Sequence, residues 1–291
     1  MSLATPFAAT RFDPKKTEAP DLPPEDYVRF KTAFMKKSGI DLNLYKDQQM
    51  QRRLYNLVER AHLTAFMEYF ALMEADPQVY ATFLDRMTIN VSELYRNPEK
   101  WAELRDAILP PMLALNRPLK IWSAGCSYGA EPYSMAILLD QITPKVRHAI
   151  HATDLDRKIL EKAKEGWFSA ADVRNLTPQE RERYFTPLPG TSKAVPLADA
   201  LPSLALTPEI RQRVQFRPHN LLADRFETDY DLICCRNVVI YFTDDAKEAL
   251  YARFREALRP GGVLLVGGTE RIFSHREMGL DSPLPFFYRR V

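Results

Sequence analysis

Ile121-Trp-Ser-Ala-Gly-Cys-Ser-Tyr-Gly-Ala-Glu-Pro-Tyr-Ser-Met135 is the stretch of sequence that decides the fold. A short apolar run passes into a glycine turn and then into a helical pattern, the order typical of a parallel strand and its crossover helix. Gly125 and Gly129 let the backbone approach a ligand at the carboxyl end of the strand, where open α/β sheets bind nucleotides. Their G-x-x-x-G spacing matches neither the dinucleotide fingerprint nor the phosphate loop, so a diphosphate cradle is not supported. An ordinary tight turn remains the alternative.

Short apolar runs alternate with helical segments from residue 119 onward, which predicts an α/β domain built on a parallel sheet. A proline-dotted insert at about 170–213 interrupts this alternation, and we expect it to form a small subdomain or lid. The expected strands are 119–124, 146–153, 214–217, 231–235 and 263–267, with a candidate edge strand at 286–289, and the expected helices are 132–142, 156–165 and 244–258.

The N-terminal part of the chain has a different spacing of apolar residues. Apolar residues from 24 to 109 recur at helical spacing, as in Tyr27, Phe30 and Phe34, which predicts an all-helical bundle. Asn97-Pro98 is a cap followed by proline, a helix start, and Pro110-Pro111 predicts a helix end. Residues 1–23 are rich in proline and are expected to be a flexible lead-in. The chain is therefore divided into 1–23, 24–109 and 110–291.

Composition excludes several classes of protein. The 291 residues are 46% hydrophobic and 27% charged, and 40 Lys and Arg against 38 Asp and Glu leave a net charge of +2. Such a balance argues against a basic coat for nucleic acid. The apolar runs are far shorter than the roughly 20 residues of a membrane-spanning helix, so we expect a cytoplasmic protein without membrane insertion. Three cysteines and five histidines show neither a disulfide framework nor zinc-ligand spacing, so no metal is expected.

Two further segments place polar residues at the same edge of the predicted sheet. His151-Ala-Thr-Asp-Leu-Asp156 ends the second strand, where an acidic side chain can accept both hydroxyls of a ribose. We assign Asp154 to the ribose and Asp156 to the cap of the next helix. Tyr230-Asp-Leu-Ile-Cys-Cys-Arg-Asn-Val-Val-Ile-Tyr-Phe242 brings Arg236, Asn237 and Tyr241 to that edge. A ribose acceptor without a diphosphate cradle suggests adenosine carried on something other than a dinucleotide.

The ordered motifs of the chain resemble those of the chemotaxis protein methyltransferases, the CheR family. The resemblance runs from about residue 24 to the C-terminus and includes Arg52-Arg53-Leu54, Asn90-Val-Ser-Glu-Leu-Tyr-Arg96, the Ser-x-G-x-E-P-Y-S core around Glu131, Thr153-Asp-Leu-Asp156, His219-Asn-Leu-Leu222 and Cys235-Arg-Asn-Val-Val-Ile-Tyr-Phe242. It implies a helical bundle followed by a class I, Rossmann-like methyltransferase domain with a small inserted subdomain. It also implies methyl transfer from S-adenosylmethionine to receptor glutamates, with S-adenosylhomocysteine as the product.

The resemblance also implies roles for particular residues. The candidate cofactor contacts are Asn90, Ser92, Arg96, Glu131, Asp154, Asn220, Leu221, Cys235, Arg236 and Asn237, and the candidates beside the transferred methyl group are Arg96 and Tyr241. This chain departs from the family pattern in having Ser92 where threonine is usual, Leu94-Tyr95 where two phenylalanines are usual, and Ala130 where an acidic residue is common. Ser92 keeps a hydroxyl, so we expect cofactor binding to survive.

Charge in the helical half predicts how the protein substrate docks. Residues 29–60 hold eight basic and three acidic residues, and residues 61–100 hold three basic and six acidic ones. Arg53 and Arg60 lie seven residues apart on one flank of a predicted helix, where both could face an acidic partner helix. A solvated helix face is the plain alternative. The family resemblance favours docking, so we expect Arg53 and Arg60 to contact the cytoplasmic helices of a chemoreceptor.

Two other functions are kept as alternatives. A methyltransferase acting on a different macromolecule, such as a nucleic acid, would share the cofactor half, but the chain has no Asp/Asn-Pro-Pro-Tyr/Phe stretch and no basic stripe interleaved with aromatics. A non-catalytic signalling module would bind receptor or cofactor without turnover. The sequence makes no prediction of the oligomeric state.

Overall fold

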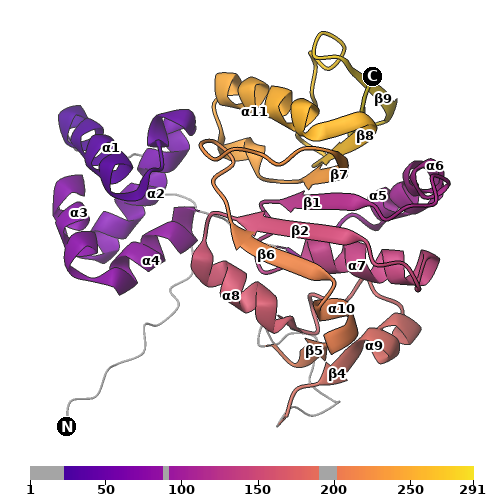
Figure 1. Cartoon of the computed structure of the whole chain (residues 1–291). Helices are drawn as coiled ribbons and strands as arrows, with labels where there is room; N and C mark the ends of the chain where they lie inside the picture. The colour runs from indigo at the N-terminus through magenta and orange to yellow at the C-terminus, as the bar shows by residue number, and fades with distance from the viewer. Residues whose placement is uncertain (1–22, 88–91, 190–201) are drawn as a thin grey trace.

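The computed structural model describes residues 23–87, 92–189 and 202–291, which form a helical bundle, a central sheet and a small second sheet (Figure 1). The bundle comprises α1 (Pro24–Ser38), the 3₁₀ turn η1 (Leu42–Leu44), α2 (Asp47–Arg60), α3 (Phe66–Ala75) and α4 (Pro77–Met87). Its centre is a cluster of aromatic rings in which Phe30 contacts Phe34, Phe66, Phe70 and Phe83. The predicted helical spacing is thereby confirmed, since the apolar face of α1 is the one that is buried.

The central sheet has seven strands in the order β6-β2-β1-β7-β8-β10-β9. They are β1 (Lys120–Ala124), β2 (Ala149–Asp154), β6 (Val214–Pro218), β7 (Tyr230–Cys235), β8 (Leu258–Val266), β9 (Leu280–Leu284) and β10 (Phe287–Arg290). The strands from β6 to β8 pair in parallel, and β10 pairs antiparallel with both β8 and β9. Because the chain runs outward from β1 in one direction and then from β7 in the other, the sheet has a switch point between these two strands, where ligands bind in such folds.

Helices cover both faces of this sheet. The crossover helices are α7 (Ala130–Ile142), α8 (Arg157–Glu165) and α11 (Asp244–Ala257). Successive strand residues pack on opposite faces: Cys235 lies in the core shared by α11 and the N-terminal bundle, and Cys234 lies in the core under α7. All three cysteines are buried and free. The helices that follow the bundle, α5 (Pro98–Glu103), the π-helical η2 (Leu104–Ile108) and α6 (Leu109–Leu113), share the α7 core.

Two local expectations were wrong. Pro110 and Pro111 lie inside α6, which continues directly from the π-helical η2 and ends only at Leu113. The C-terminal edge carries two strands, since β9 accompanies the predicted edge strand and pairs with it as a hairpin. The sequence of β9 did not reveal it because Leu280 is its only buried residue, so the alternation of a half-buried strand is absent.

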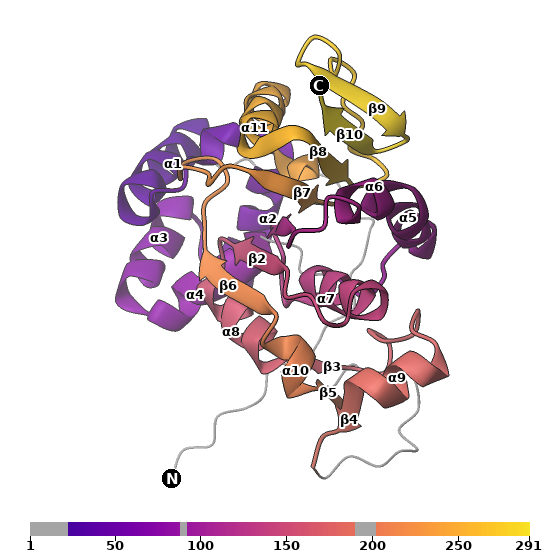
Figure 2. The same cartoon turned by 45° about the vertical axis from the view of Figure 1, so that its right-hand side comes forward.

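A three-stranded antiparallel sheet lies at the predicted insert, and its first strand begins just before the predicted bounds. It consists of β3 (Trp167–Phe168), β5 (Leu204–Leu206) and β4 (Phe185–Pro187), with α9 (Pro178–Tyr184) and α10 (Pro208–Arg211) beside it. Figure 2 shows this subdomain below α7 and α8, on the side of the sheet away from α11. Asp140 on α7 binds it through Arg183 and the Tyr184 hydroxyl.

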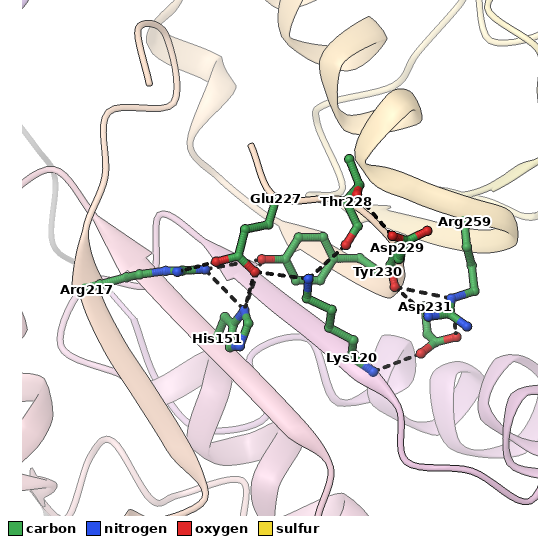
Figure 3. A network of polar contacts seen from close by, with 9 residues as sticks. All are labelled: Lys120, His151, Arg217, Glu227, Thr228, Asp229, Tyr230, Asp231 and Arg259. Carbon is green, nitrogen blue, oxygen red and sulfur yellow. Dashed lines mark hydrogen bonds and ion pairs between the residues drawn. The ribbon is translucent and has the colours of Figure 1, made fainter. Parts of the chain in front are cut away.

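A network of ion pairs fastens the loop between β6 and β7 to the sheet (Figure 3). Glu227 lies among Arg217, Lys120 and His151, which come from β6, β1 and β2, and its Oε2 is 3.0 Å from the Lys120 ammonium. The Arg217 hydrogen bond, followed by that of Lys120, lowers the pKa of Glu227 to about 2. The return of this loop to β7 is thus fixed by charges on three strands.

We predict that Glu227→Gln lowers the free energy of unfolding by about 1 kcal/mol at pH 7, a modest value because the side chain is 42% exposed and solvent screens the pairs. The pKa of Glu227 is lower in the folded state, so its contribution is present above pH 4.5 and is lost as the pH falls toward 2. Urea unfolding at several pH values should show the difference between wild type and variant shrinking below pH 4.5. The exposed Glu182→Gln serves as a control that should change nothing.

Candidate active site

A cavity lies between the N-terminal bundle and the carboxyl ends of the parallel strands, where the sequence analysis predicted a site. Backbone contacts hold the two parts together: the Lys46 N–H donates to the Tyr241 carbonyl at 2.8 Å, and the Thr243 N–H donates to the Leu44 carbonyl at 2.9 Å. The predicted residues that line the cavity are Ser92, Arg96, Glu131, Asp154, Asn220, Leu221, Arg236, Asn237 and Tyr241. Segments separated by about 150 residues in the sequence therefore meet around one space.

Asn90 lies outside the described residues. Three other predicted residues, Cys235, Arg53 and Arg60, do not line the cavity. Cys235 ends β7 with its side chain fully buried in the core, so the cavity wall begins at the next residue. Arg53 stacks on the Tyr241 ring at 4.6 Å and donates to the Met87 carbonyl, so it is held beside the cavity. Arg60 is exposed at the end of α2.

The glycine turn after β1 is shaped by close packing. Gly125 and Gly129 have φ values of 81° and 92°, in the left-handed region that favours glycine. A Cβ atom on Gly125 would lie 2.4 Å from Cγ2 of Val238, which belongs to the turn after β7. The turns after β1 and β7 therefore touch at the switch point, and only glycine permits this approach.

Asp154 ends β2 and joins the glycine turn to the start of α8. One carboxylate oxygen accepts the Ser127 N–H at 2.8 Å and the other accepts the Asp156 N–H at 3.0 Å. Burial raises the pKa of Asp154, and these N–H donors oppose that effect. Asp156 caps α8 through the N–H groups of Lys158 and Ile159, as the sequence indicated. Asp154 keeps lone pairs toward the cavity and could accept the hydroxyls of a ribose.

Glu131 places a second carboxylate in the cavity wall from the first turn of α7. It accepts a hydrogen bond from the Ser123 hydroxyl at 2.7 Å and lies 3.8 Å from Nη1 of Arg236. Burial raises the pKa of Glu131, and the positive charge of Arg236 counteracts this. Arg236 also donates to the Arg96 carbonyl and to the Asn97 side chain, so it positions the segment that carries Arg96. A half-buried carboxylate at this place could hold an ammonium group.

The loop after β6 forms the apolar side of the cavity. The Asn220 side chain accepts the Leu222 N–H, and the Asp224 carboxylate accepts the Asn220 N–H, which closes a compact turn. Arg253 on α11 donates to the Leu221 carbonyl at 2.6 Å. Leu221 and Leu155 line the cavity and could pack against the faces of an adenine.

Several residues that line the cavity were not among the site residues predicted from the sequence, and two of them come from the bundle. Tyr45 and Met87 come from the bundle and complete the lining, but nothing in their local sequence distinguishes them from core residues. Tyr45 packs edge-on against Phe242 at 5.1 Å. Tyr95, where the family pattern has phenylalanine, is buried against Trp101 and does not line the cavity.

The fold and this cavity define a class I S-adenosylmethionine-dependent methyltransferase. A doubly wound sheet carries a buried acid at the end of β2, a second acid in the first turn of α7, and a glycine turn without a diphosphate cradle. The model of the CheR methyltransferase, SAM binding domain, matches residues 90–283, and that of the CheR methyltransferase, all-alpha domain, matches residues 25–88. The chain belongs to the CheR methyltransferase family.

Curated relatives support this family membership, and the matches cover nearly the whole length of each relative. The chemotaxis protein methyltransferase of Listeria innocua is 37% identical over 270 residues, covering 92% of this chain and 98% of the relative. That of Escherichia coli is 30% identical, covering 95% and 94% respectively. Chemotaxis protein methyltransferase 1 of Pseudomonas aeruginosa is 31% identical, covering 89% and 95%. In the part of the chain that the structure describes, no helix is long and apolar enough to cross a membrane.

We predict that Asp154→Ala raises the Kd of S-adenosylhomocysteine by at least tenfold, because hydrogen bonds to a charged group contribute about 1.5–3 kcal/mol. Isothermal titration calorimetry measures this directly. Asp140→Asn is the matched control, because Asp140 is equally buried but binds the inserted subdomain. An Asp154→Ala variant that is folded and binds with the wild-type Kd would contradict the assignment of Asp154 to the ribose.

Proposed function

We propose that the chain transfers the methyl group of S-adenosylmethionine to side-chain carboxylates of glutamates in chemoreceptors, giving glutamate methyl esters. The observation that carries the proposal is the single cavity at the sheet edge, which brings Asp154, Glu131, Arg96 and Tyr241 together. The relatives are chemotaxis protein methyltransferases, which supports a protein substrate in chemotaxis. Glutamate as the acceptor is the finer part of the proposal and comes from the family resemblance.

The chemistry of this acceptor fits a cavity without a catalytic base. S-adenosylmethionine supplies a methyl group on a positively charged sulfur. A glutamate with a pKa near 4.3 is already ionised at neutral pH, so its oxygen forms the new bond to carbon without giving up a proton. The bond to sulfur breaks with its electron pair remaining on sulfur, so charges cancel. A dry, aligned site therefore favours the transition state, and alignment alone can contribute on the order of 7 kcal/mol.

Arg96 and Tyr241 are the residues we assign to alignment. Both line the cavity, and Arg96 sits on a segment fixed by Arg236 and by the Trp101 indole, which donates to the Arg96 carbonyl at 3.1 Å. We propose that Arg96 orients a carboxylate and that Tyr241 donates a hydrogen bond to it or forms the wall of its channel. The stacking of Arg53 on Tyr241 fixes the plane of that ring.

Docking of the receptor remains a prediction of the resemblance. Arg60 is exposed and available to an acidic helix, whereas Arg53 is half-buried on Tyr241 and would act at the edge of the cavity. Together they would guide a cytoplasmic receptor helix toward the methyl group, in the cytoplasm. The oligomeric state is left open.

The decisive experiment incubates the protein with methyl-labelled S-adenosylmethionine and receptor cytoplasmic fragments. Base-labile label on receptor glutamates is the expected result, and replacing those glutamates by alanine should abolish it. Binding of the fragments without label would favour the non-catalytic module. Base-stable label, or label on a nucleic acid offered in parallel, would favour another methyltransferase.

We predict that Tyr241→Phe lowers kcat by about tenfold or more, the loss of one hydrogen bond to a charged group, while the Kd of S-adenosylhomocysteine stays within twofold of wild type. Phenylalanine keeps the ring on which Arg53 stacks, so the cavity wall is preserved. Single-turnover methylation and calorimetry separate the two effects. An unchanged kcat would exclude the hydrogen bond from Tyr241 and leave this residue only as part of the channel wall.

A further inference from the structure

Glu270 is a buried carboxylate that the proposed chemistry does not use. It ends the Gly267-Gly268-Thr269-Glu270 turn that follows β8, and it is 4% exposed. It is not among the residues that line the cavity. A buried carboxylate is costly unless its hydrogen bonds compensate, so its partners indicate what it stabilises.

Glu270 binds the backbone of two loops. Its Oε2 accepts the Asn237 N–H at 2.7 Å and the Gly267 N–H at 2.8 Å. The N–H groups of Val239 and Ile240 lie close enough to lower its pKa, although burial has the larger effect and raises it. Its Oε1 is buried and makes no hydrogen bond to any described residue. The carboxylate therefore faces backbone N–H groups from the turn after β7.

The packing around this carboxylate is tight. A Cβ on Gly267 would lie 2.5 Å from Oε2 of Glu270 and 2.9 Å from the Asn237 nitrogen, so only glycine fits there. Asn237 has a φ of 61°, a left-handed conformation that non-glycine residues adopt at a cost. The charge-assisted hydrogen bond from its N–H compensates for this cost.

The turn that Glu270 holds forms one wall of the cavity. Its Val238 packs against Gly125 of the turn after β1. Its Arg236 binds the Arg96 carbonyl and lies near Glu131. A displacement of this turn would therefore move three parts of the cavity wall together.

We propose that Glu270 is a positioning residue for the cofactor site: its carboxylate fixes the turn from Arg236 to Tyr241 against the glycine turn, and so sets the affinity for the cofactor without touching it. The inference rests on S-adenosylmethionine as the cofactor and is independent of which side chain is methylated. A purely structural role would lower the stability of a Glu270 variant and leave its Kd for the cofactor unchanged. The proposed role raises that Kd.

The test compares three variants of the full chain by the Kd of S-adenosylhomocysteine and by urea unfolding. Glu270→Ala is expected to raise the Kd about tenfold. Glu270→Gln, which puts an NH₂ group among N–H donors, is expected to raise it about threefold. Asp231→Asn is the matched control, because Asp231 is also buried and also accepts a backbone N–H, from Lys120, but lies at the opposite end of β7. It should lower stability and leave the Kd unchanged.

Two results would overturn the proposal. One is a wild-type Kd in folded Glu270→Ala; the other is an Asp231→Asn variant whose Kd rises as much as that of Glu270→Ala. If Glu270→Ala does not fold, Glu270→Gln decides: a raised Kd with faster amide hydrogen exchange at Asn237 supports the role, and wild-type values of both refute it. Because no methyl acceptor is present, failure of glutamate methylation would leave these outcomes unaffected.

Discussion

The reversal of strand order between β1 and β7 is the constraint on which the site depends. Parallel strands expose their carboxyl ends at one edge, and the chain leaves β1 and β7 in opposite directions, so a space remains between the turns that follow them. Val238 against Gly125 sets how closely those turns approach. The N-terminal bundle then closes the space through backbone hydrogen bonds between residues 44–46 and 241–243.

Negative charge collects at this edge. Asp154 and Glu131 line the cavity, Glu270 lies behind its wall, and burial raises the pKa of each carboxyl. Isolated buried carboxylates are unfavourable, and here backbone N–H donors and Arg236 compensate. In the proposed cofactor site, the sulfonium and ammonium groups of S-adenosylmethionine would compensate further for these carboxylates.

Much of this could be predicted from the sequence because the deciding signals are local. The glycine turn, Asp154 and the Arg236–Asn237 turn each follow an apolar strand, and topology alone brings strand ends together. The stacking of Arg53 on Tyr241 could not be predicted, because it depends on how two domains pack. Tyr45 looks like any core tyrosine in its local sequence. Glu270 gave no signal because the partner that links it to the cavity wall is a backbone group, the Asn237 N–H, about 30 residues earlier in the chain.

The bundle and one face of the sheet share a single apolar core. Phe34 and Leu54 belong to the same buried cluster as Trp122 and Leu264, so among the described residues apolar packing continues from the helical domain into the sheet beside the cavity. Two modules joined in this way unfold together, because unfolding of either one exposes apolar surface of the other to water. The helical part is therefore better regarded as a fixed wall of the catalytic domain than as an exchangeable adaptor.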